Sequence, residues 1–153
     1  MFLLGAFAGL RRKEIDLLEW SSFQWNENAI RIESTEFFEA KTNESHADVY
    51  IDGEVMEILR GFRAKATGAF VIESPVLPRP GVTYPHYRCR LHFNKLTKWL
   101  REHGVTNSKT LHVLRKEFGS VINAAYGIEG RRWLCAIRIS ESQAPIMWTT
   151  GET

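Results

Sequence analysis

The sequence predicts an α+β domain that is mainly helical and carries a small three-stranded antiparallel sheet. Apolar residues recur with helical spacing near the N-terminus and through most of the second half, whereas residues 23–51 alternate with the period of a β-strand. A chain of 153 residues with 44% hydrophobic content can bury one sizeable core but not two, so we expect one folded domain.

The first half should contain two helices and a meander of three strands. The helices, over residues 3–8 and 14–20, meet at a corner formed by Gly9, Leu10 and Arg11. The sheet is expected to follow at once, with strands over residues 29–33, 36–42 and 47–51 and with Lys41 at the edge of the last turn.

Three longer helices and a loop should complete the fold. Residues 53–65 have helical spacing with an expected inward face of Val55, Ile58, Leu59 and Phe62. Beyond its first residues, the following stretch, 70–85, should be a loop, because it holds four of the five prolines. The last two helices are expected to end at glycines, the first over residues 88–104 and the second over 109–127.

Composition restricts the possible functions. Twenty Lys and Arg residues against eighteen Asp and Glu residues leave a net charge of only +2, so any contact with nucleic acid must come from a local cluster. Cys89 and Cys135 show no metal-binding spacing, which fits a reducing compartment, and we expect a cytoplasmic protein. The opening apolar run is too short to cross a membrane. The chain begins inside this helix without a cap or a polar lead-in, and it is therefore expected to be a fragment.

Cationic side chains occur at three separated places. Arg11, Arg12 and Lys13 follow the glycine corner, Lys41 lies in the segment AKT, and the late helix carries LHVLRKEFGS. In that helix His112 and Arg115 are three residues apart and therefore project from one face. Each group alone would be ordinary solvated surface, so the information lies in their order and spacing.

This order resembles the catalytic domain of the tyrosine recombinases, the phage-integrase family. The stretch AGLRRKEIDLLEWSSF resembles the first motif of that family, KTNESHADVYI its β-hairpin lysine segment, and LHVLRKEFGSVI its His-x-x-Arg motif. The resemblance runs from about Phe2 to Gly127. It implies double-stranded DNA as the partner, other recombinase protomers in a synaptic complex, no membrane, and neither a metal nor another cofactor.

Residue by residue, the resemblance implies that Arg11 and Arg115 clamp the scissile phosphate. His112 would assist them, and Lys41 would be the general acid for the leaving 5′ oxygen. Guanidinium groups suit this chemistry because they stay charged and match the geometry of phosphate oxygens. Glu14 would orient the site or cap the corner rather than react.

The two remaining cations of the opening stretch have a less specific expected role. Arg12 and Lys13 would lie along DNA or face water.

The family pattern breaks after residue 128. The family requires a further helix and a nucleophilic tyrosine, but residues 129–153 have no helical period and no tyrosine. Tyr126 is too close to the His-x-x-Arg motif to be that nucleophile. We therefore expect residues 1–128 to be a partial catalytic domain, inactive as written, with an aberrant and poorly ordered tail. The alternatives are a non-catalytic DNA-binding remnant and an unrelated α+β domain with incidental cations.

A shifted reading frame offers an explanation for this break. Suppose that each codon starts at the third base of the present codon. The bases that encode Met147, Trp148 and Thr149 can then encode only Val-Asp. The same shifted frame can be read over residues 133–152. The translations that the genetic code permits there include one with the dipeptide Arg-His and later the dipeptide His-Tyr, as in the missing family segment. We therefore expect a frameshift near residues 129–132, in the gene or in its sequencing.

Overall fold

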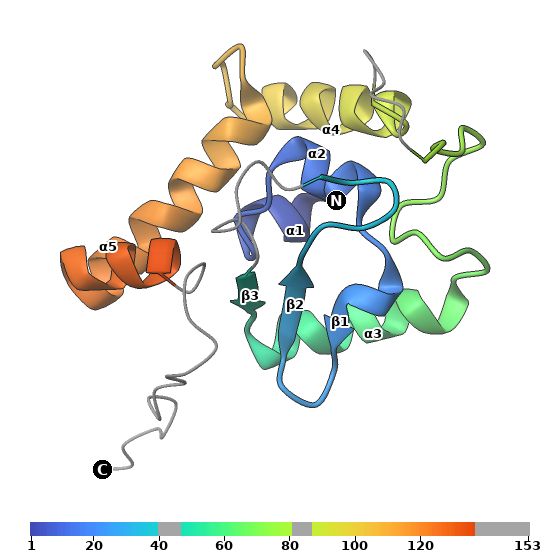
Figure 1. The fold of residues 1–153 in the computed structure, drawn as a ribbon. Coiled ribbons are helices and arrows are strands. Elements are labelled where there is room, and N and C mark those ends of the chain that lie inside the picture. Colours follow the sequence, from blue (N-terminus) through green and yellow to red (C-terminus); the bar gives the residue numbers. More distant parts are fainter. Residues whose placement is uncertain (40–46, 81–86, 137–153) are drawn as a thin grey trace.

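The computed structural model describes residues 1–39, 47–80 and 87–136 (Figure 1). Five helices, one 3₁₀ turn and three strands occur in these residues. In chain order they are α1 (Phe2–Ala6), α2 (Arg12–Leu17), η1 (Trp20–Ser22), β1 (Phe23–Gln24), β2 (Ala29–Ile32), β3 (Ala47–Tyr50), α3 (Gly53–Lys65), α4 (Arg90–Glu102) and α5 (Thr110–Ala136). The expected class, mainly helical with a small antiparallel sheet, is confirmed.

The sheet is antiparallel with the order β1-β2-β3, but one of its strands differs from the expected segments. The strand expected at residues 36–42 is wrong over 36–39, and residues 40–46 lie outside the described part of the chain. The hydroxyl of Thr35 accepts hydrogen bonds from the backbone N–H groups of Phe37 and Phe38, at 3.3 and 3.1 Å. These local bonds fold the backbone back on itself, so it does not extend as a strand there.

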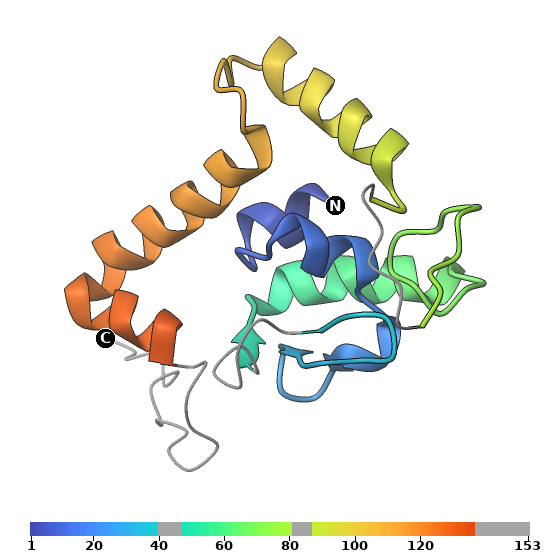
Figure 2. The ribbon, with the colours of Figure 1, turned by 45° about the horizontal axis from the view of Figure 1, so that its top comes forward.

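One core joins the first helices, the sheet, α3 and α4. Its fully buried large side chains come from all these elements: Leu4, Ile15, Ile30, Met56 and Phe93. Figure 2 shows α1 and α2 in the middle of the molecule, with α4 and α5 forming two arms around them. Leu10, in the motif-bearing corner between α1 and α2, belongs to this core.

The inward face expected for α3 is partly wrong. Val55 and Leu59 are buried as expected, but Ile58 and Phe62 are 50% and 58% exposed, while Met56 is fully buried. The apolar positions of this helix cover a wider arc than the surface available to them, so one edge of the arc remains in solvent. Helical spacing alone does not show which edge that is.

A buried carboxylate joins α2 to the start of α4. Asp16 accepts hydrogen bonds from the backbone N–H groups of Arg88, at 2.9 Å, and Cys89, at 2.7 Å. The Arg88 guanidinium donates to the carbonyls of Asp16 and Ile72 and lies 4.2 Å from the ring centre of Phe70. Burial raises the pKa of the Cys89 thiol to about 12, so this cysteine stays protonated at neutral pH.

Helix α5 is interrupted where the sequence predicted its end. Gly127 has φ 69° and ψ −167°, which is not a helical conformation. The backbone is helical again over residues 128–136, where no helix was expected, and residues 137–153 lie outside the described part. The expectation of a poorly ordered tail therefore stays a prediction. Among the described residues, no helix is long and apolar enough to cross a bilayer.

Candidate functional site

Arg11 is the cap residue just before α2 and is held by the carboxylate of Glu14. Its backbone N–H donates to Glu14 Oε2 at 2.6 Å, and its Nη1 lies 3.3 Å from Glu14 Oε1. The Glu14 side chain is only 4% exposed, whereas that of Arg11 is 46% exposed. Glu14 thus caps the corner, as expected, and orients a guanidinium that still reaches solvent.

Arg115 reaches the same corner from α5. Its Nη1 donates to the backbone carbonyl of Gly9, two positions before Arg11 and far away in the sequence. The structure therefore brings together the two elements that carry the expected phosphate-clamping arginines. His112 lies on the same helix, one turn before Arg115, and is exposed. Lys41 lies outside the described residues, and its expected role as general acid stays a prediction.

Gly5 of α1 and Gly9 of the corner allow α5 to approach α1 and the corner closely. A Cβ on Gly5 would lie 3.2 Å from Leu114 Cδ1, and one on Gly9 would lie 2.5 Å from Phe118 Cδ1. Gly9 also has φ +58°, a conformation that residues with a Cβ adopt at a cost. The glycine of the corner is thus required both by its backbone conformation and by the ring packed against it.

Arg12 has a packing contact that the sequence analysis did not anticipate. Its guanidinium carbon lies 4.3 Å from the ring centre of Tyr87 and 4.6 Å from that of Phe93, which joins α2 to the start of α4. Lys13 is exposed, and its Nζ lies 5.8 Å from the ring centre of Phe38. The expectation is that Arg12 and Lys13 lie along DNA or face water. Lys13 is exposed and Arg12 is partly buried, and the contact with DNA stays a prediction.

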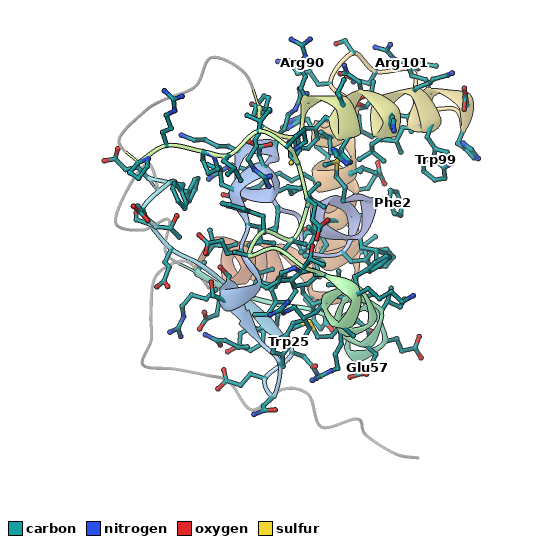
Figure 3. All side chains as sticks on the ribbon, turned by 90° about the vertical axis from the view of Figure 1, so that its right-hand side faces the viewer. Phe2, Trp25, Glu57, Arg90, Trp99 and Arg101 are labelled. Carbon is teal, nitrogen blue, oxygen red and sulfur yellow. The ribbon has the colours of Figure 1, made fainter. Side chains whose placement is uncertain are left out.

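A second cationic surface lies on α4 and was missed in the sequence. We call it the α4 basic face, and it consists of the exposed residues Arg90, Lys95, Lys98 and Arg101. Figure 3 shows Arg90 and Arg101 on the outer side of the helix, opposite Trp99. The ring centres of Trp99 and Phe2 are 5.6 Å apart. The only acidic side chain of this helix is Glu102, 3.9 Å from Lys98. The recurrence of cations at helical spacing was the available signal.

Tyr126 lies far from the arginines along α5. About three turns separate it from Arg115, or about 16 Å at 1.5 Å per residue. Its side chain is 46% exposed and ends the first part of the helix, just before Gly127. A phosphate held by Arg115 is therefore out of reach of this hydroxyl.

Comparison with known proteins gives a fold. No family model and no curated protein matches the chain. Among solved structures, XerA recombinase is similar with a TM-score of 0.60 at 16% identity, over 92% of this chain and 47% of that one. The Tn1549 transposon integrase in complex with transposon right end DNA is similar with a TM-score of 0.59 at 16% identity, over 88% and 48%. The chain has the tyrosine recombinase fold.

The tyrosine recombinase fold covers nearly all of this chain but only part of each similar structure. In the Tn1549 integrase bound to circular intermediate DNA, 93% of this chain matches 51% of that one, with a TM-score of 0.57 and 17% identity. The chain thus spans about half the length of these recombinases. The likeness concerns architecture, and the roles that the resemblance implies for individual residues stay predictions.

Proposed function

We propose that this chain is the phosphate-binding part of a site-specific DNA recombinase catalytic domain. The observation that carries the proposal is the bond from Arg115 to the Gly9 carbonyl, which places one motif arginine against the corner that ends with the other, Arg11. Arg11 and Arg115 would clamp the scissile phosphate, His112 would assist, and Lys41 would protonate the leaving 5′ oxygen. This set stabilises charge on the phosphate oxygens through fixed guanidinium donors.

Double-stranded DNA is the proposed partner. The α4 basic face and the exposed side chains of Arg11 and Lys13 supply positive charge although the net charge is only +2. Similar structures include an integrase bound to transposon DNA, which supports this choice. We expect binding that is weak, largely independent of sequence and reduced by salt, because phosphate contacts dominate it. Other recombinase protomers would join a synaptic complex, in the cytoplasm.

The polypeptide as written would not cleave DNA. Tyr126 is distant from the proposed clamp, and residues 129–153 contain no tyrosine. We propose that residues 1–128 are a partial catalytic domain and that a frameshift replaced the segment after it. Loss of the nucleophile in covalent catalysis typically costs on the order of a million-fold in turnover.

Restoring the shifted frame tests the catalytic proposal. The nucleotide sequence across residues 128–153 is determined first, and a chain is then made with the shifted frame, in which a tyrosine spans the codons of Ile146 and Met147. Supplied with an N-terminal DNA-binding domain and a cognate site, it should form a covalent 3′-phosphotyrosyl adduct with nicked DNA. The chain as written should form none.

Two results would redirect this proposal. An adduct from the chain as written, mapped to Tyr126, would show that the nucleophile has been misplaced and that the frameshift is not needed. DNA binding by the restored chain without any adduct would favour the alternative, a non-catalytic DNA-binding remnant.

A further inference from the structure

We propose that Phe118 and Gly9 are positioning residues for the phosphate clamp. The ring of Phe118 fixes the position of the Gly9 peptide group, whose carbonyl accepts the hydrogen bond from Arg115. In this way it fixes the two arginine-bearing segments relative to each other. The expected effect on phosphate binding rests on the proposed function. Its structural part, the hold on Arg115, is tested separately below.

Two side chains of α5 contact the same residue of the corner. Phe118 and Arg115 are three residues apart, so they project from one face of the helix. The ring packs where a Gly9 Cβ would stand, with Cδ1 at 2.5 Å and Cε1 at 2.9 Å from that position. The Arg115 guanidinium donates to the carbonyl of the same glycine. Together these contacts fix both the place and the orientation of one peptide group.

The link from Gly9 to Arg11 is short and rigid. Leu10 is 4% exposed, and its N–H donates to the Leu4 carbonyl at 3.1 Å. The Arg11 N–H is held by Glu14 at 2.6 Å. A displacement of the Gly9 peptide would therefore move Arg11 or break one of these bonds, because consecutive Cα atoms are only 3.8 Å apart.

Ordinary core packing is the competing explanation for Phe118, and the chain offers a matched control. Leu114 lies on the same helix, is 7% exposed and packs against Gly5 of the same segment. Gly5 lies within α1 and has an ordinary backbone conformation, whereas the Arg115 bond described above goes to the Gly9 carbonyl. Truncating Leu114 therefore removes packing between α1 and α5 but leaves the bond to Gly9.

The experiment compares Phe118→Leu, Phe118→Ala and Leu114→Ala in the full chain, at a temperature where all are folded by circular dichroism. Nuclear magnetic resonance of the arginine side chains first measures the solvent exchange of the Arg115 N–H groups without ligand. Titration with inorganic phosphate then gives a dissociation constant for each variant and for Arg115→Ala.

We expect faster Arg115 exchange in both Phe118 variants and a wild-type rate in Leu114→Ala. The dissociation constant for phosphate should rise about tenfold in Phe118→Ala, which is the effect of displacing one charged hydrogen bond. It should rise less in Phe118→Leu and under about twofold in Leu114→Ala. Equal effects in the Phe118 and Leu114 variants, or wild-type exchange in Phe118→Ala, would overturn the inference.

The two readouts separate this inference from the proposed function. If the wild-type chain and Arg115→Ala bind phosphate equally, the clamp proposal fails. The exchange rates would then still decide whether Phe118 holds Arg115 on Gly9.

Discussion

The corner around Gly9 and the outer part of α5 differ in how completely the chain covers them. Leu10, Ile15 and Glu14 at the corner are buried, and hydrogen bonds reach it from two directions. On α5 beyond Phe118, Val121 is 64% exposed and Tyr126 46%. In the proposed interpretation, the segment that should cover this part of the helix belongs to the aberrant part of the sequence. Among the described residues, the corner before α2 is therefore well packed, whereas the part of α5 beyond Phe118 is largely exposed to solvent.

The largest effect should come from adding a methyl group at the corner. Gly9→Ala combines a positive φ with a clash against Phe118 and should lower the free energy of unfolding by about 4 kcal/mol. Urea unfolding measures it. Gly104→Ala is the control, since Gly104 also has positive φ, at +93°, but nothing lies within 4 Å. It should lose only about 1–2 kcal/mol, and equal losses would show that the Phe118 contact is unimportant.

Removing the carboxylate between α2 and α4 should have the next largest effect. Asp16→Ala leaves two buried N–H groups without their acceptor and should cost about 3 kcal/mol. Asp52→Ala is a matched control, because Asp52 is exposed and accepts one bond, from the Glu54 N–H at 2.8 Å. It should cost about 1 kcal/mol. Urea unfolding of both variants checks the difference, and a reversed order would refute the described role of Asp16.

The exposed part of α5 should tolerate change. Val121→Ser should alter the free energy of unfolding by less than about 0.5 kcal/mol, because the side chain is already in solvent, and it should raise solubility. Leu114→Ser on the same helix should be strongly destabilising. Thermal unfolding and sedimentation would measure both properties. A cost above about 1 kcal/mol for Val121→Ser would show that another segment covers this helix.

The sequence predicted those parts of the site that depend on local pattern. The glycine corner, the placement of His112 and Arg115 on one helix face, the end of α4 just before Gly104 and the interruption of α5 at Gly127 follow from spacing and backbone preference. Contacts between distant segments could not be predicted this way. The stacking of Arg12 on Tyr87 depends on how α2 meets α4, and the exposed edge of α3 depends on which neighbour covers it. The helix over 128–136 was missed because its apolar spacing is irregular.

The central claim is that Arg11 and Arg115 form a phosphate clamp, and duplex binding tests it most directly. A labelled duplex is titrated at two salt concentrations with the wild-type chain, Arg11→Ala, Arg115→Ala and Arg60→Ala. Each variant loses one positive charge, but Arg60 lies on α3, paired with Glu57 at 3.0 Å. We expect about tenfold weaker binding for the first two variants, under about twofold for Arg60→Ala, and weaker binding at higher salt throughout. Equal losses in all three variants, or affinities unchanged by salt, would contradict the clamp.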